Sequence, residues 1–331
     1  MHQRQLGPFE VSAIGLGCMN VAMGYDPADP AEAERLIGAS IDSGYTFLDT
    51  ASMYGWGVSE QMIGRILKHR RDEYVLASKC GFAKGNDNST LFDGSPEAIH
   101  RTCEESLRNL QTEVIDLYYL HRIDPQVPIE DSIGALADLV HDGKIRTIGL
   151  SEVSTESLHR AHAVFPITAL QSEYSLWSRT PERKILQACE ELDVAFVPFS
   201  PLARSFLTGI TPPLDKLREE DIRATIARPR FEGDNFAQNR KLLAPYKEIA
   251  DEVGCSMAQL ALAWVLARQN RKMIPIPGTK DFAHMQENAA AGDIKLDAAT
   301  VERLDALINE NTVAGERYTD AGMKAADSEK D

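Results

Sequence analysis

Paired cysteines, long apolar runs and basic charge are all scarce in this sequence of 331 residues. No two cysteines have the C-x-x-C spacing of a zinc or redox site; they are Cys18, Cys80, Cys103, Cys189 and Cys255. We therefore expect free thiols in a reducing compartment, and no metal site. No apolar run reaches the length of about 18 residues that a membrane helix needs, and the first residues, MHQRQLGPFE, hold no apolar signal-peptide run. We expect a soluble, cytoplasmic protein without a membrane partner.

Basic residues are outnumbered by acidic ones, 35 against 50, which gives a formal net charge of −15. Nucleic acids and anionic membranes attract basic surfaces, so this balance argues against nucleic acid as a partner. Hydrophobic residues make up 43% and charged residues 26% of the chain, as is usual for a globular protein. A local basic pocket for a phosphate remains compatible with the acidic total.

Several nucleotide-binding and hydrolytic signatures are also absent. Gly15 and Gly17 begin a G-x-G-x-x-G pattern after the first apolar run, but Asn20 stands where the third glycine is required. There is no G-x-S-x-G and no H-E-x-x-H motif. The sequence therefore argues against a dinucleotide-binding fold of the doubly wound type, a serine hydrolase and a zinc protease.

The chain instead shows a regular alternation of short apolar runs and amphipathic stretches. The runs are rich in Val, Ile, Leu, Phe and Tyr without strict alternation, which indicates strands buried on both faces of a parallel sheet. They cover residues 13–18, 45–49, 74–79, 115–121, 145–151, 167–172, 194–200 and 273–277. A closed barrel and an open doubly wound sheet both fit this alternation.

Local signals mark turns and helix starts. The pair Gly7-Pro8 predicts a short hairpin before the first strand. Ser95-Pro96 and Thr180-Pro181 each place an N-cap residue before a proline, which is typical of a helix start. Ser256 and Gln259 fit a capping box.

Two segments do not follow the alternation. Residues 203–235 form a long, charged stretch punctuated by Pro and Gly, which is typical of a functional lid or a disordered loop. Residues 318–331 are polar, and we expect this tail to be frayed. No internal repeat or linker divides the chain, so we expect one domain over residues 1–331.

Polar residues capable of chemistry stand at the end of nearly every predicted strand. They are Asp49, Lys79, His121, Ser151, Gln171 and Ser200. In a barrel the carboxyl ends of all strands meet on one face, whereas in an open sheet they spread along an edge. The joint placement of these residues favours the barrel.

The sequences around these residues resemble the aldo-keto reductases. The segments that carry the resemblance are GYTFLDTASMYGWGVSE (44–60), YVLASKC (74–80) and LYYLHRID (117–124). The likeness extends from LGPFEVSAIGLGCM near the start to IPIPGTKDFAHMQEN at 274–288. It implies a (β/α)8 TIM barrel with a short N-terminal hairpin and a long loop after the seventh strand. The ending GERYTDAGMKAAD is more similar to stand-alone bacterial-type reductases than to relatives that serve as regulatory subunits of channels.

The resemblance implies a catalytic tetrad of Asp49, Tyr54, Lys79 and His121 that reduces an aldehyde or ketone to an alcohol. Tyr54 would donate the proton, Lys79 would lower the pKa of the phenol, and Asp49 would hold Lys79. His121 would orient the substrate oxygen, where negative charge develops. Loops beside the tetrad supply candidates for the substrate pocket: Trp56 and Phe82, and also Met19, Met23, Tyr25 and Trp177.

The resemblance also implies a nicotinamide cofactor. Ser151 and Gln171 match the residues that hold the nicotinamide amide, while Glu152 stands where the family has Asn. Phe199 would stack on the nicotinamide, and Ser200, Leu202 and Arg204 would cover the pyrophosphate. The remaining cofactor residues are Gly17, Met19 and Asp49 near the nicotinamide, Gly278, Thr279, Lys280 and His284 for the 2′-phosphate, and Glu287 and Asn288 for the adenine.

Two departures from the family pattern affect the choice of cofactor. Asp281 is acidic beside the expected phosphate, and His284 replaces the commoner Arg, which binds phosphate through two parallel hydrogen bonds. Lys280 still favours NADP(H), with NAD(H) as the alternative. The expected partner is a small carbonyl substrate, and a monomer is the default state, with a homo-oligomer open. The alternative function is that of an NADPH-binding, redox-sensing regulatory subunit of a channel.

Overall fold

The computed structural model describes residues 1–26, 28–87, 89–268 and 272–331, and its centre is a sheet of parallel strands. In spatial order the neighbours are β3, β4, β5, β8, β9, β10 and β11. Their bounds are β3 Leu16–Gly17, β4 Phe47–Asp49, β5 Val75–Cys80, β8 Ile115–Leu120, β9 Ile145–Ser151, β10 Ile167–Glu173 and β11 Ala195–Phe199. Each strand thus lies beside its predecessor in the sheet, as in a barrel.

The segment 273–278 closes this sheet into a (β/α)8 barrel, which confirms the predicted fold. Ile274 and Ile276 donate to carbonyls of β11, while the carbonyls of Pro275 and Pro277 accept from Gly15 and Gly17. A regular eighth strand was predicted over 273–277, but the two prolines have no N–H to give to a ladder, so only isolated bridges form on either side.

The backbones are close at this seam. A Cβ atom on Gly17 would lie 2.7 Å from the Ile276 carbonyl oxygen, and one on Gly278 would lie 2.6 Å from the Asn20 side chain. A side chain at either position would therefore collide with its neighbours, so both are glycine. Both lie at the carboxyl end of the barrel, where β3 ends.

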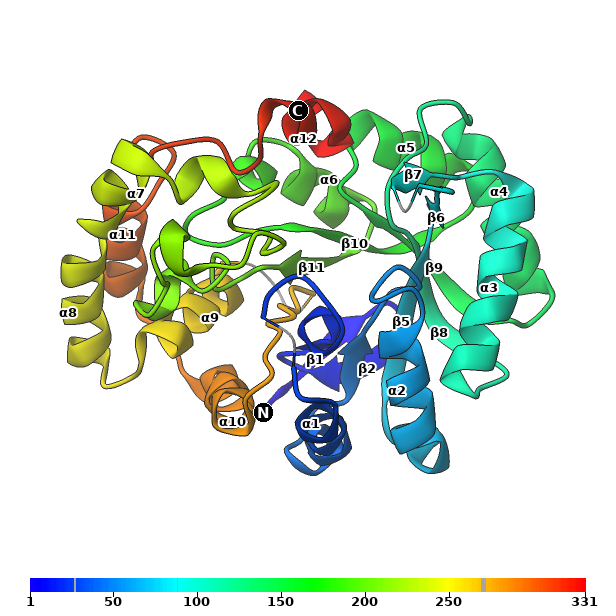
Figure 1. Ribbon diagram of the computed structural model, residues 1–331, viewed down its shortest axis with the longest axis horizontal. Coiled ribbons are helices and arrows are strands. Elements are labelled where there is room, and N and C mark those ends of the chain that lie inside the picture. Colours follow the sequence, from blue (N-terminus) through cyan, green and yellow to red (C-terminus); the bar gives the residue numbers. More distant parts are fainter. Residues whose placement is uncertain (27, 88, 269–271) are drawn as a thin grey trace.

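Helices surround the barrel on its outside (Figure 1). Those that follow the early strands are α1 Pro30–Asp42, α2 Val58–Leu67, α3 Pro96–Leu110, α4 Ile129–His141, α5 Thr155–Val164 and α6 Ile185–Glu191. The later ones are α7 Gly233–Arg240, α8 Leu243–Val253, α9 Met257–Ala267, α10 Phe282–Ala290, α11 Ala298–Leu307 and α12 Asp320–Ala325. No single helix of the described residues is long and apolar enough to cross a membrane. Two consecutive segments, Gly233–Val253 (α7 and α8) and Met257–Ala267 (α9), meet those criteria only together, and they are bent by 79° relative to each other.

One apolar cluster lies inside the barrel, and a second, larger one includes residues of the surrounding helices. The barrel interior is filled from successive strands by Phe47, Ala77, Leu117, Tyr119, Ala169, Ala195, Val197, Ile274 and Ile276. The hairpin of β1 (Gln3–Leu6) and β2 (Phe9–Ser12), predicted from the sequence, adds Leu6 and Val11 to this cluster. Gly7 packs on Thr168 at the start of β10, so the hairpin covers the amino end of the barrel and leaves the carboxyl end for a site.

The predicted helix starts are confirmed in two of three places. Ser95 caps α3, and Ser256 and Gln259 form the capping box of α9. Thr180 does not begin a helix: Thr180–Glu182 is a single 3₁₀ turn, and α6 begins only at Ile185. The carboxylate of Glu182 accepts hydrogen bonds from Arg179 and Tyr174 instead.

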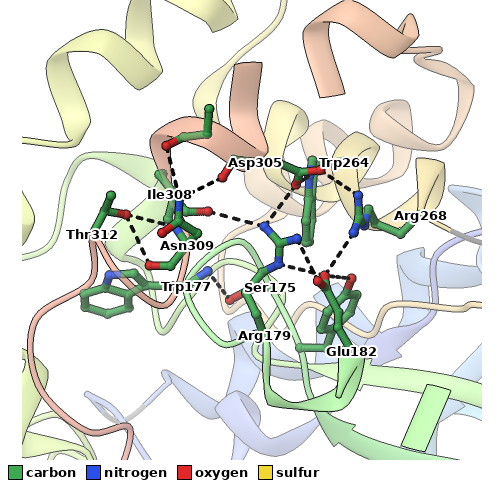
Figure 2. A network of polar contacts seen from close by, with 12 residues as sticks. Ser175, Trp177, Arg179, Glu182, Trp264, Arg268, Asp305, Ile308, Asn309 and Thr312 are labelled. Carbon is green, nitrogen blue, oxygen red and sulfur yellow. Dashed lines mark hydrogen bonds and ion pairs between the residues drawn. The ribbon is translucent and has the colours of Figure 1, made fainter. Parts of the chain in front are cut away.

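This turn belongs to a polar network that joins three parts of the chain (Figure 2). Arg179 binds Glu182 through two nitrogens and reaches Asp305 of α11 at 3.0 Å. Arg268, directly after α9, also binds Asp305, at 2.7 Å, and the indole of Trp264 donates to the same carboxylate. Asp305 is therefore the common acceptor that ties α9 and α11 to the turn after β10.

Replacing Asp305 with Ala is expected to lower the free energy of unfolding by about 2 kcal/mol, because two arginines and a buried indole lose an acceptor. Urea denaturation measures this loss. The matched control is Glu252→Ala, which breaks the exposed pair with Arg303 and should leave the free energy of unfolding almost unchanged. Equal losses in the two variants would contradict the role given to the network.

Candidate active site

A buried ion pair lies at the carboxyl end of β4 and β5. The ammonium of Lys79, which is completely buried, lies 2.5 Å from Asp49 Oδ1 and donates to the carbonyl of Thr50 at 2.7 Å. Gln171 of β10 donates to the other oxygen of Asp49 at 2.8 Å. The side chains of three strands thus hold one ammonium in a fixed position.

The phenol of Tyr54 lies next to this ammonium. The loop after β4 brings its hydroxyl to 3.5 Å from Lys79 Nζ. On the other side, the rings of Tyr54 and His121 meet edge to face, with centroids 5.9 Å apart. Phe82, on β6 (Phe82–Lys84), packs against His121 in the same way at 5.0 Å. The four residues of the predicted tetrad therefore lie together, with Tyr54 at their centre.

Burial and the ion pair set the protonation states. Burial lowers the pKa of Lys79, but Asp49 and Tyr54 outweigh it and hold the pKa above its ordinary value, so the ammonium persists. Burial raises the pKa of the Asp49 carboxyl, while Lys79 and Gln171 act in the opposite direction. We take the pair as ionised, because Asp49 receives N–H donors on both oxygens.

The phenol and the imidazole are both held neutral. Burial raises the pKa of Tyr54; Lys79 opposes this but does not reverse it. The net shift is upward, whereas the sequence led us to expect a phenol whose pKa is lowered. For His121, burial together with the charges of Lys79 and Arg122 puts the pKa well below its ordinary value. The site therefore offers two neutral hydrogen-bond donors or acceptors beside one fixed positive charge.

The tetrad opens into a cavity of about 1410 Å³. Asp49, Tyr54 and His121 form part of its wall, and Phe82, Phe92 and Met53 form an apolar side next to them. The cavity extends past β11 to the start of α10, where Gly278, Thr279 and Lys280 line it. A space of this size and length is large enough for a dinucleotide and a small second molecule.

Comparison with known proteins gives a match over most of the chain. The model of the Aldo/keto reductase family matches residues 13–309. Among curated relatives, probable aldo-keto reductase 1 of Glycine max is 38% identical over 96% of this chain and 93% of its own length. Aldo-keto reductase yakc [NADP(+)] of Schizosaccharomyces pombe is 39% identical over 95% of this chain and 94% of its own.

The chain belongs to the aldo/keto reductase family.

Solved structures of the family agree with the barrel described above. A glycerol dehydrogenase from Gluconobacter oxydans superposes with a TM-score of 0.85 at 27% identity, covering 95% of this chain and 97% of that one. An aldo/keto reductase from Klebsiella pneumoniae, solved in complex with NADP and acetate, superposes with a TM-score of 0.72 at 28% identity, covering 96% and 98%.

Nearly all residues that the family resemblance assigned to the cofactor line the one cavity. Near the tetrad these are Gly17, Met19, Asp49, Ser151, Gln171, Phe199, Ser200, Leu202 and Arg204. At the far end they are Gly278, Thr279, Lys280, His284, Glu287 and Asn288. Segments from both halves of the chain thus form a continuous wall, as an extended cofactor requires.

The far end fits a phosphate in part. Lys280 is exposed, and within the described residues its ammonium donates to one backbone carbonyl, that of Asp26, at 3.4 Å. It stands just before the N-terminus of α10, where backbone N–H groups favour an anion. Asp281 has a local structural reason to be acidic, because its carboxylate caps α10 by accepting the N–H of His284 at 2.9 Å.

Three expected residues lie away from the cavity wall. Trp56 is exposed, and Trp177 is buried behind the site, stacked on Phe206 with ring centroids 4.1 Å apart. Both carboxylate oxygens of Glu152 are occupied by other protein groups, and its side chain is 1% exposed without lining the cavity. Position in a loop beside the tetrad does not fix the direction of a side chain, which is why the sequence did not separate Trp56 and Trp177 from Met19, Met23, Tyr25 and Phe82, which do line the cavity. Glu152 was assigned to the nicotinamide amide from the family resemblance, but its carboxylate is turned to other protein groups.

The cavity wall also contains residues that sequence reasoning missed. Arg122 follows His121 directly, and its guanidinium donates to the His121 carbonyl at 2.6 Å and to Ser151 Oγ at 3.0 Å. Its position next to His121 was a usable signal. Phe92, on β7 (Thr90–Phe92), pairs with Phe82 across a small hairpin. No local sequence pattern predicted this hairpin.

Both irregular segments contribute to the site. The long loop 203–235 is ordered by the 3₁₀ turns η4 Phe206–Thr208, η5 Leu214–Lys216 and η6 Arg228–Arg230, and Ile222 and Ile226 reach the cavity. The prediction that the tail is frayed is wrong. It forms α12 and the turn η8 Asp327–Lys330, and Tyr318, Gly322, Ala325 and Ala326 line the cavity.

The neutral state of His121 can be measured directly. Its imidazole is expected to stay neutral well below the pH at which a free histidine is protonated, because burial and the charges of Lys79 and Arg122 all lower its pKa. Titration of the histidine ring protons by NMR checks this, with His121→Asn to assign the signal. An inflection near pH 6.5 from His121 would contradict the electrostatics described here.

Proposed function

We propose that this protein is an NADP(H)-dependent oxidoreductase that reduces an aldehyde or ketone to an alcohol, with Tyr54 as the general acid. The observation that carries the proposal is the Tyr54 hydroxyl 3.5 Å from the buried Lys79 ammonium, at the wall of a cavity long enough for the cofactor. Family membership and the NADP named for two relatives support the same reading.

When bound, the cofactor supplies a hydride to the carbonyl carbon. The chain must then deliver a proton to the carbonyl oxygen and stabilise the negative charge that develops on it. Tyr54 is protonated at neutral pH because burial raises its pKa, so it can donate a hydrogen bond and then the proton. Lys79 stabilises the phenolate that remains, since its own charge is fixed by Asp49.

His121 has a separate role in orientation. Because its imidazole is neutral, it can donate one hydrogen bond to the carbonyl oxygen without competing with Tyr54 as an acid. Its backbone carbonyl is held by Arg122, and its ring is enclosed by Tyr54 and Phe82. Phe82, Phe92 and Met53 keep water away from the reacting carbon and favour an apolar group on the substrate.

The cofactor end of the proposal depends on Ser151, Gln171 and Phe199 for the nicotinamide and on Lys280 for the 2′-phosphate, all of which line the cavity. The alternative, a channel-regulating subunit, has no support in the relatives described above, which carry reductase and dehydrogenase names.

Replacing Tyr54 with Phe is expected to lower kcat for aldehyde reduction at least about 100-fold, since general acid catalysis contributes this much or more. Binding of NADPH should not change, because the proposal gives the hydroxyl a role in proton transfer and none in holding the cofactor. Steady-state kinetics with a good aldehyde, together with an NADPH titration followed by protein fluorescence, give both quantities. Wild-type turnover in Tyr54→Phe would rule out the proposed acid.

Replacing Lys280 with Met is expected to raise the Kd of NADPH about tenfold, which corresponds to ~1.4 kcal/mol, and to leave the Kd of NADH almost unchanged. The reason is that only NADPH carries the 2′-phosphate that the exposed ammonium would bind. Lys295→Met is a matched control, because this exposed lysine does not line the cavity. A wild-type preference for NADH would instead assign NAD(H) as the cofactor.

A further inference from the structure

Glu152 faces away from the cavity and toward the C-terminal segment. Its Oε1 accepts the backbone N–H of Glu173 at 2.8 Å. Its Oε2 accepts from Arg317 Nη2 at 2.5 Å and from Ser328 Oγ at 2.6 Å. The backbone at Glu152 is in the left-handed region, with φ of 55°, an uncommon state for a residue other than glycine. Both oxygens of the Glu152 carboxylate are thus occupied by these partners.

Arg317 is the cation that makes this arrangement possible. It is 6% exposed, and besides Glu152 it donates from Nε to Glu329 at 2.5 Å. Its Nη1 lies 3.6 Å from Glu173, whose carboxylate is also bound by Arg204 at 2.7 Å. Burial raises the pKa of Glu152, but Arg317 outweighs it and holds that pKa at about 2.

The cluster is therefore a set of ionised groups buried together. Removing one member of such a set leaves an uncompensated charge in the interior, which costs far more than the pair contributes when intact.

Further hydrogen bonds join the tail to the connection between β9 and α5. Asp327 accepts the N–H of Ser154 at 2.8 Å, and Asp331 accepts the N–H of Thr155 at 3.1 Å. Figure 1 shows the red C-terminal segment beside α5, in agreement with these bonds. This connection begins immediately after Ser151, which lines the cavity. A displacement of the tail would therefore reach the residues beside the tetrad.

The tail also forms a wall of the cavity that holds the tetrad. Tyr318, next to Arg317, lies against the guanidinium of Arg204, with 5.4 Å from its ring centroid to the guanidinium carbon. Thr319 donates to the carbonyl of Ile226 at 2.8 Å, which joins the tail to the long loop after β11. Gly322, Ala325 and Ala326 complete this wall with small side chains.

We propose that Arg317 is a positioning residue: by pairing with Glu152 it holds the segment 318–326 as the outer wall of the active-site cavity and fixes the Ser151–Glu152 turn below it. This inference rests on the proposed function for its kinetic consequence and on the buried ion pairs for its structural one. Arg317 itself does not touch the reacting atoms. It acts through the wall, so its loss should weaken binding more than it slows chemistry.

The test uses Arg317→Met, Glu152→Gln and the double variant. Arg317→Met leaves Glu152 buried without its cation, while the double variant removes one charge of each sign and restores the balance. Arg303→Met is the matched control, because it removes a guanidinium from the exposed pair with Glu252. Hydrogen–deuterium exchange of the tail peptides, the Kd of NADPH, and KM and kcat for small and bulky aldehydes are measured for each protein.

In Arg317→Met we expect the amides of residues 318–331 to exchange at least about tenfold faster and the Kd of NADPH to rise about fivefold. KM for the aldehyde should rise about tenfold while kcat changes less than about threefold. The double variant should recover most of each loss, since only the pairing, and not either residue alone, is required. Arg303→Met should behave as wild type in every measurement.

Unchanged KM, Kd and tail exchange in Arg317→Met would overturn the proposal, and so would a double variant that is no better than Arg317→Met. Lower thermal stability with wild-type KM would likewise show that Arg317 only stabilises the fold. If Arg317→Met does not fold, Arg317→Lys keeps the charge but loses the forked contact, and the same comparison is made with it. If the wild type reduces no aldehyde, the proposed function fails, and exchange and NADPH binding still decide the role of Arg317.

Discussion

The buried pair of Asp49 and Lys79 is the constraint on which the site depends. An ammonium with no exposure is stable only if a carboxylate and further acceptors surround it, and here Asp49 and the Thr50 carbonyl do so. These residues come from different strands, and Gln171 from a third strand orients the carboxylate. The barrel must therefore be closed and in register before the charge is tolerated. Once the ammonium is fixed, Tyr54 and His121 need only be placed beside it for the site to gain its chemistry.

The barrel separates apolar and charged regions along its axis. At the amino end, Leu6 and Val11 of the hairpin pack with the interior residues Phe47, Leu117 and Val197 in an apolar cluster. At the carboxyl end there are two clusters of buried charge: Asp49 with Lys79 on β4 and β5, and Glu152 with Arg317 directly after β9. The first faces the cavity and the second faces the tail.

The sequence could predict features that depend on residues close together in the chain, and it could not predict those that depend on distant partners. The strand-end residues Asp49, Lys79 and His121 were found because each stands in a short local context at the end of an apolar run. The capping box of Ser256 was found for the same reason. The missing regularity of 273–277 could have been expected from Pro275 and Pro277, since both lack the N–H of a ladder. By contrast, Trp177 turns away from the cavity because Phe206 and Arg230 pack on it, and neither partner is near it in the chain.

The tail was misjudged because its order depends on a partner 165 residues away. A polar C-terminus with Asp, Glu and Lys predicts fraying only if its charges find no fixed partners. Here Arg317 binds Glu152, at a position where the family resemblance led us to expect Asn. An amide at position 152 would need no cation, whereas a buried carboxylate does. The buried carboxylate of Glu152 and the ordered tail are therefore linked, because Arg317 of the tail supplies the positive charge that the carboxylate needs.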